Sequence, residues 1–151
     1  MDDDIIVYDK AKWHHEGDYP TGLPTENAYT HTGMFLAWLA DRGLLSQEFA
    51  EDFHEDLQQL KERKITPGRI FEIVDGVLAS DMLNEDGNAF SKTYYYAPEG
   101  MYFRDYHATL ALTLPSDYHA ADTWENYDKL KATIDRRYDE WRQSNGARQE
   151  A

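Results

Sequence analysis

The chain has 151 residues and a formal net charge of −14, from 29 acidic and 15 basic side chains. This length is enough to bury the core of one ordinary domain, and the 14% aromatic content argues against a disordered chain. The absence of cysteine excludes disulfides, thiolate nucleophiles, cysteine-ligated zinc and iron–sulfur clusters.

The acidic balance argues against direct nucleic-acid binding, which needs a basic surface. The amino terminus is acidic where a secretory signal is basic, and no apolar run approaches the ~18 residues of a membrane span. We therefore expect a soluble, cytoplasmic protein that contacts neither nucleic acid nor membrane.

The first segment, residues 1–29, lacks helical periodicity and contains the turn-rich stretch YPTGLP at 19–24. We predict an extended arm packed on a helical domain over residues 30–144. Within the arm, residues 5–8 form a candidate strand, and Trp13 is a candidate anchor to the core. Residues 145–151 are expected to fray.

Three helices are predicted in the first half of the helical domain. The first runs from residue 30 to Gly43 and places Met34, Phe35, Trp38 and Leu39 on one face. A second, capped by Ser46, runs to Lys64 with apolar residues every three or four positions. A third begins at Thr66-Pro67 and extends to Val77 and Leu78, with Gly76 as a candidate interruption.

Three further helices follow the turn at residues 84–88. They are predicted over 90–97, over 102–110 and from a capping-box-like pair, Asp122 and Glu125, to Ser144. No convincing set of strands accompanies them. The pattern predicts an all-α, single-domain bundle of about five or six helices.

Acidic residues gather in the first half of the chain. Residues 1–60 carry 13 acidic and 3 basic side chains, a net charge of −10, against −4 for the remainder. The second predicted helix has an acidic face opposite its apolar stripe. This face consists of Glu48, Glu51, Asp52, Glu55 and Asp56. It is either a solvated outer surface or a binding face for a cationic protein.

Histidines and carboxylates supply the other candidate chemistry. His14 and His15 are adjacent, His31 begins the first helix, and the tripeptide Asp-Tyr-His occurs at 105–107 and 117–119. Neighbouring residues of an extended segment point to opposite sides, so His14 and His15 cannot easily share a metal ion. Without a nucleophile elbow, phosphate-binding loop or HExxH motif, we predict no catalytic residue, metal or cofactor.

Four stretches resemble a family of small acidic bacterial proteins of unknown function. They are THTGMFLAWL at 30–39, ITPG at 65–68, DMLNEDGNAF at 81–90 and DTWENY at 122–127. The resemblance covers nearly the whole chain. Such proteins are associated with immunity to toxins delivered between bacterial cells, including by type VI secretion. The resemblance implies this role and supplies no catalytic residues.

Together, these observations predict an immunity protein, not an enzyme, that binds a cationic toxin and occludes its active cleft. The acidic face would contact basic residues, and exposed tyrosines in the stretch Tyr94 to Tyr96, above all Tyr94 and Tyr95, would serve as aromatic anchors. One alternative is a small metal-dependent or histidine/carboxylate hydrolase that uses His14, His31 and His107. It would be favoured by bound metal or by a pocket in which these histidines converge. Another alternative is a regulatory homodimer.

Overall fold

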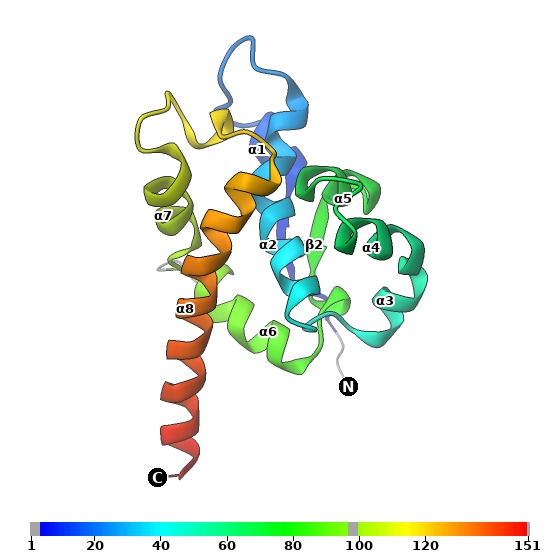
Figure 1. The fold of residues 1–151 in the computed structure, drawn as a ribbon, viewed down its shortest axis with the longest axis vertical. Helices are drawn as coiled ribbons and strands as arrows, with labels where there is room; N and C mark the ends of the chain where they lie inside the picture. The colour runs from blue at the N-terminus through cyan, green and yellow to red at the C-terminus, as the bar shows by residue number, and fades with distance from the viewer. Residues whose placement is uncertain (1–3, 97–99, 151) are drawn as a thin grey trace.

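A computed structural model describes residues 4–96 and 100–150, with side chains described as far as Ser144. The chain is mainly helical, so the predicted all-α class is confirmed, and one small two-stranded sheet is added to it (Figure 1). No helix in these ranges combines the length and apolar character that a bilayer span requires.

The described residues form eight α-helices, two strands, and short 3₁₀ and π turns, labelled η, between them. In chain order they are β1 (Val7–Lys10), α1 (Ala11–His15), η1 (Thr25–Tyr29), α2 (Thr30–Asp41), α3 (Gln47–Asp52), α4 (His54–Lys61), α5 (Pro67–Ile73), β2 (Val77–Ala79), η2 (Ser80–Met82), α6 (Glu85–Ser91), η3 (Lys92–Tyr96), α7 (Tyr102–Tyr106), η4 (His107–Ala111), η5 (Asp117–His119) and α8 (Trp124–Glu150).

The small sheet joins the N-terminal segment to the middle of the chain. β1 pairs antiparallel with β2, with Asp9 opposite Leu78. The prediction that residues 77 and 78 are helical was wrong. Asp75 and Gly76 both adopt a positive φ of 66°, which ends α5 and turns the chain into β2.

The N-terminal segment lies against the helices through small and aromatic side chains. Tyr8 and Ala11 belong to the buried core, and the Ala11 amide donates to the Gly76 carbonyl. Trp13 is not the anchor that we predicted, because it is 53% exposed. The contact with the core is made by β1 and the first residue of α1 instead.

α2 is the central helix and is buried along almost its whole length, from Thr30 to Leu39. α5 packs on one side of α2 and α8 on another (Figure 1). Gly33 permits the close approach of α5, because a Cβ at this position would lie 2.2 Å from the Pro67 carbonyl oxygen. Trp38, fully buried, donates its indole N–H to Asp135 of α8 at 2.9 Å.

The predicted helix over 46–64 is divided into α3 and α4. Ser46 caps α3 as predicted, since its hydroxyl accepts from the Phe49 amide. Phe53 then leaves helical geometry, with φ −112° and ψ 27°. Its ring stays against Phe49, with 4.8 Å between centroids, while the chain continues as α4 in a new direction (Figure 1).

The later helices lie near their predicted positions, with different ends. The segment 84–88, expected as a turn, contains the first residues of α6, and Asn84 caps it by accepting from the Gly87 amide. α6 continues into the π turn η3, and α7 continues into the π turn η4. The predicted end at Ala97 lies outside the described residues.

The last helix, α8, begins at Trp124 and is capped by the Thr123 hydroxyl, which accepts from the Asn126 amide. Asp122 therefore does not serve as the predicted cap. Its carboxylate accepts from the Thr66 hydroxyl and the Gly68 amide at the start of α5. The backbone remains helical through Glu150, beyond the predicted end at Ser144, while Ala151 lies outside the described residues.

Candidate functional sites

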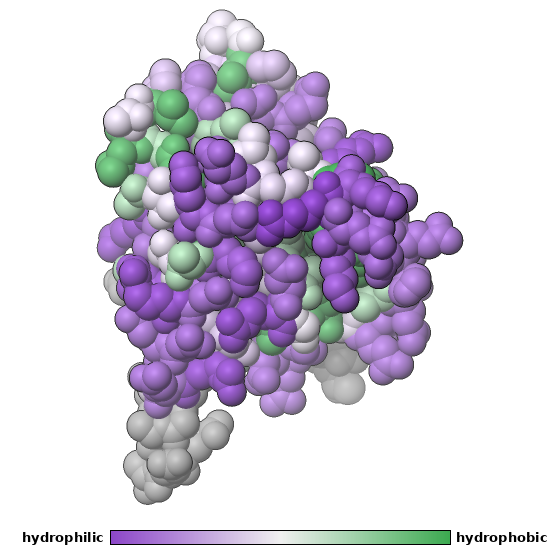
Figure 2. Space-filling model, viewed as in Figure 1, coloured by the Kyte–Doolittle hydropathy of each residue, from purple (hydrophilic) through white to green (hydrophobic). Residues whose placement is uncertain are grey.

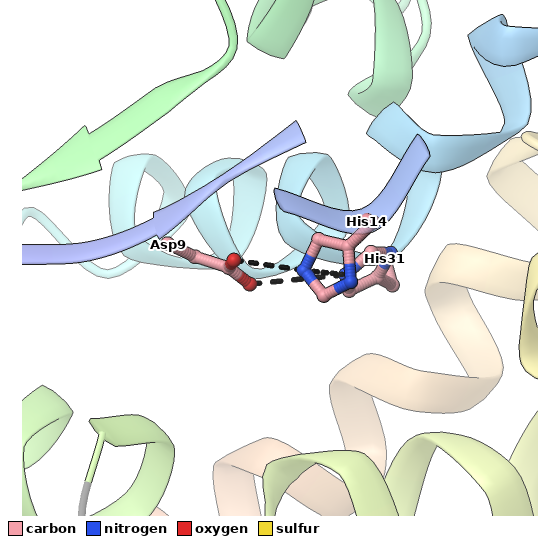
Figure 3. A group of neighbouring side chains, drawn as sticks. All are labelled: Asp9, His14 and His31. Atoms are coloured by element: carbon pink, nitrogen blue, oxygen red, sulfur yellow. Dashed lines mark hydrogen bonds and ion pairs between the residues drawn. The ribbon is translucent and has the colours of Figure 1, made fainter. Parts of the chain in front are cut away.

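Three titratable side chains from separate elements meet beside the N-terminal half of α2. Asp9 comes from β1, His14 from α1 and His31 from α2, and their side chains point toward one another (Figure 3). β1 turns directly into α1, so pairing of β1 with β2 places Asp9 and His14 together over the start of α2. We call these three residues the Asp–His–His cluster.

The contacts within the cluster are short. His14 Nε2 lies 2.7 Å from Asp9 Oδ1 and 3.2 Å from His31 Nε2, and His31 Nε2 lies 3.8 Å from Asp9 Oδ2. The three side chains are largely removed from solvent, with exposed fractions of 6% for Asp9, 18% for His14 and 3% for His31. Water therefore screens these interactions weakly.

Neighbouring polar groups complete the cluster. Asp9 also accepts hydrogen bonds from the Lys10 amide at 2.9 Å, the Thr32 hydroxyl at 3.2 Å and the Tyr95 hydroxyl. The other ring nitrogen of His14, Nδ1, lies 2.8 Å from the Tyr118 hydroxyl. These partners fix the orientation of the carboxylate and of one imidazole.

Burial favours the neutral forms of both Asp9 and His31, so it raises the pKa of the acid and lowers the pKa of the base. Burial favours the neutral form of Asp9, but hydrogen bonds and charge interactions with His14 and His31 outweigh it, and the pKa of Asp9 lies well below its usual range. Burial lowers the pKa of His31, although Asp9 favours its charged form. The cluster thus holds an ionised carboxylate beside an imidazole that tends to stay neutral.

The cluster reaches the surface on one side. A cleft of about 510 Å³ is lined by Asp9 and His14 together with aromatic side chains and one guanidinium, including Tyr96, Phe103 and Arg104. Tyr96 is 51% exposed and Phe103 37% exposed, so the mouth of the cleft is aromatic. Ligands that enter it would meet His14 and the edge of Asp9.

Of the three histidines in the hydrolase alternative, the structure brings together His14 and His31. His107 lies outside the cluster and pairs with Asp117 at 2.8 Å in an exposed position. His119, from the second Asp-Tyr-His tripeptide, contacts the Ser116 hydroxyl at 2.8 Å. Sequence reasoning missed Asp9, for which the available signal was a carboxylate beside the apolar residues of a candidate strand.

The acidic face is a second candidate site. Glu48, Glu51, Asp52 and Glu55 are exposed and Asp56 is half-buried on α3 and α4. Within the part of the chain that the structure describes, none of the five forms an ion pair with a basic side chain. This side of the molecule presents mostly hydrophilic residues (Figure 2).

An apolar groove adjoins this acidic face. It has a volume of about 440 Å³ and lies between α3 and the β1–β2 sheet. Its apolar lining comprises Ile5, Val7, Phe49, Phe53, Val74, Val77, Ala79 and Met82, and its charged lining comprises Glu48, Asp52, Asp81 and Lys10. The groove therefore combines an apolar floor with three carboxylates and one ammonium group. We call it the acidic groove.

The prediction that Tyr94 and Tyr95 are exposed anchors was wrong. They are only 4% and 5% exposed, and their rings pack into the aromatic core. Their hydroxyls donate to buried carboxylates, Tyr94 to Asp105 at 2.6 Å and Tyr95 to Asp9. The π turn η3 directs both side chains inward, whereas Tyr96 faces outward.

Comparison with known proteins gives a family without an assigned activity. Residues 7–120 match the model of a family described as a domain of unknown function, DUF7832. No curated protein and no solved structure matches the chain. The matched residues include the Asp–His–His cluster, the acidic face and all of the acidic groove except Ile5.

Proposed function

The chain belongs to this family of unknown function, and we propose that it is an inhibitor, in the manner of an immunity protein, that neutralises a cationic partner toxin. The observation that carries the proposal is the set of exposed carboxylates on α3 and α4 without basic partners among the described residues. These charges repel one another, and a basic partner relieves that repulsion on binding.

The helix dipole explains the position of only some of these acidic residues. Glu48 lies in the first turn of α3, and Glu55 and Asp56 lie in the first turn of α4, where the helix dipole favours negative charge. Glu51 and Asp52 lie at the opposite end of α3, where the dipole disfavours it. A purely structural role therefore does not account for the whole face.

The acidic groove offers apolar surface that a partner protein can bury, in addition to the charges of the acidic face. Buried aromatic or aliphatic anchors dominate the energy of most protein interfaces, while rim charges mainly set the association rate. Because Tyr94 and Tyr95 are buried, we assign the anchor to the partner. A basic segment of the partner that carries one large apolar side chain fits the acidic groove. The apolar side chain would lie against Phe49 and Met82, and the basic side chains of the segment would lie near Glu48 and Asp52.

A charge-reversal experiment tests this proposal. The wild-type chain, the double variant Asp52→Lys/Glu55→Lys and a control, Glu16→Lys/Asp18→Lys, are used side by side to capture proteins from the native host. The control changes the net charge equally through two exposed residues outside α3 and α4. We expect a basic protein that the wild type and the control retain and the double variant loses.

The captured protein is then expressed alone and with each form of the chain. The proposal predicts that it is toxic alone, that the wild type and the control restore growth, and that the double variant does not. A captured protein that is harmless, or that all three forms neutralise equally, would contradict inhibition through the acidic face.

The hydrolase alternative has one observation in its favour, which is the convergence of His14 and His31 with Asp9. It requires a reactive ligand at the cluster, and the cleft lined by Asp9 and His14 gives access. A hydrolase would lose turnover on substitution of His14, whereas an inhibitor of the proposed kind would still neutralise its partner.

A further inference from the structure

The Asp–His–His cluster has a geometry that hydrogen bonds do not fully explain. We propose that Asp9, His14 and His31 bind one divalent transition-metal ion, for which zinc is the best fit. This inference is independent of the inhibitor function, because it concerns none of the residues of the acidic face or the acidic groove.

His14 Nε2 cannot satisfy both of its neighbours with the single proton that it can carry. His14 Nε2 lies within hydrogen-bond distance of both Asp9 Oδ1 and His31 Nε2, at 2.7 and 3.2 Å. A ring nitrogen carries at most one proton, which points along one direction in the ring plane. If His14 Nε2 carries a proton and donates it to Asp9, no well-aligned donor remains for His31 Nε2. If His31 Nε2 instead donates to His14 Nε2, the lone pair of His14 Nε2 cannot bond to the carboxylate of Asp9. Two protonated rings would bring two N–H groups together.

A cation removes this conflict. Neutral imidazole nitrogens and an ionised carboxylate all present lone pairs, and a metal ion among them accepts from all three at once. An ionised carboxylate and neutral imidazoles are the protonation states that ligation requires.

The distances agree with coordination. Zinc–nitrogen and zinc–oxygen bonds of about 2.0–2.1 Å place the ligand atoms of a tetrahedron roughly 3.3 Å apart. His14 Nε2 lies 2.7 Å from Asp9 Oδ1 and 3.2 Å from His31 Nε2, while His31 Nε2 lies 3.8 Å from the other carboxylate oxygen, Oδ2. One ligand atom from each of the three residues lies within 4.8 Å of the other two.

The surrounding hydrogen bonds are those of a supported metal site. Metal-binding histidines commonly donate their other ring N–H to an oxygen, and metal-binding carboxylates are themselves hydrogen-bonded. His14 Nδ1 lies 2.8 Å from the Tyr118 hydroxyl, and Asp9 accepts from Thr32 and Tyr95. These partners hold two of the three ligands before a metal arrives.

The ligand set selects the class of metal. Two imidazoles and one carboxylate suit zinc and neighbouring transition metals, whereas calcium and magnesium prefer sites built from oxygen alone. Three protein ligands leave a fourth position for water or a small ligand. The cleft beside Asp9 and His14 leads to this position.

Zinc titration of an untagged, chelator-treated chain tests the proposal. We expect one zinc ion per chain and, at a hundredfold excess over Kd, a rise in melting temperature of roughly 5–10 °C. His14→Gln and Asp9→Asn should each lower the affinity at least about a hundredfold, because each removes a ligand. His15→Gln, on the same helix but outside the cluster, should retain wild-type affinity.

X-ray absorption spectroscopy of the wild-type zinc complex identifies the zinc ligands directly, so the proposal can be tested even if a variant fails to fold. Two imidazoles and one oxygen ligand from the protein are expected in the first coordination shell. The proposal is overturned if the wild type binds no zinc, if His15→Gln loses as much affinity as His14→Gln, or if fewer than two imidazoles are bound. Because no partner is needed, these results do not depend on the proposed inhibition, and the Asp52→Lys/Glu55→Lys variant should bind zinc normally.

Discussion

At the scale of single residues, buried carboxylates organise the aromatic core. Asp105 is 7% exposed, and it accepts from the Tyr94 hydroxyl and from two nitrogens of Arg137 on α8, at 2.6, 2.9 and 3.1 Å. This arrangement explains why Tyr94 faces inward. It also means that the charge of Asp105 depends on one guanidinium for its compensation.

Removal of that guanidinium should therefore be costly. We expect Arg137→Met to lower the free energy of unfolding by about 3 kcal/mol, because it leaves a buried carboxylate without its countercharge. Arg136→Met provides a matched control, since Arg136 is an exposed neighbour on the same helix. It should change stability by less than about 0.5 kcal/mol. Equal losses in urea denaturation would contradict this account of Asp105.

At the scale of elements, local signals in the sequence predicted helix starts well. Ser46 and Thr66 cap their helices as expected, because a cap depends on residues within one turn. Gly43, where the first helix was predicted to end, has a left-handed φ of 71° after α2. The break at Phe53 and the turns η3 and η4 were not predicted, because tertiary packing decides them.

Pairing between distant segments was also beyond sequence reasoning. β2 pairs with β1, roughly seventy residues earlier in the chain. Without knowledge of that partner, the three apolar residues 77–79 look like the last turn of the preceding helix. The Asp–His–His cluster depends on this pairing. The histidines were identifiable as candidates, but their approach to Asp9 and to each other was not.

The close contact between α2 and α5 depends on the absence of a side chain at Gly33. Gly33→Ala should lower the free energy of unfolding by about 2–3 kcal/mol, because its methyl group would overlap the Pro67 carbonyl in a packed core. Gly22→Ala is the control. Gly22 has a φ of 84° in an exposed loop with no atom near its would-be Cβ, so only the backbone strain of about 1 kcal/mol applies. A smaller loss for Gly33→Ala than for Gly22→Ala in thermal unfolding would contradict the close approach.

At the scale of the whole molecule, buried tyrosines make stability depend on alkaline pH. Burial is the main cause that raises the pKa of several phenols above the ordinary value of 10.0. These are Tyr94, Tyr95, Tyr102, Tyr106 and Tyr127. Burial and the neighbouring Tyr96 raise the pKa of Tyr8 to about 12. The folded chain therefore holds these groups neutral at pH values where the unfolded chain ionises them.

The sign of the effect follows from linkage. The stability due to these phenols is fully present below pH 10, and it is lost as the pH rises further, because ionisation then favours the unfolded chain. We expect tyrosinate absorbance from the buried groups to appear cooperatively, together with loss of helical circular dichroism. Gradual ionisation of all 11 tyrosines near pH 10 with the helices intact would contradict their burial.

Charge is distributed as unevenly in the structure as in the sequence. The acidic face lies on α3 and α4, while α8 forms much of the molecule's other side and carries several ion pairs, such as Lys131 with Asp135 (Figure 1). The sequence predicted these residues on one helix face, whereas the structure distributes them over two short helices. Sequence reasoning could not locate the acidic groove, whose walls come from three separate parts of the chain.

The rate of association with the captured partner tests the inhibitor proposal most directly. It would be measured at several salt concentrations for the wild type, Asp52→Lys/Glu55→Lys and Glu16→Lys/Asp18→Lys. We predict that the first double variant binds at least about tenfold more slowly at low salt and with a weaker salt dependence, while the second stays near the wild-type rate. Identical rates and salt slopes for all three proteins would show that the acidic face does not guide the partner.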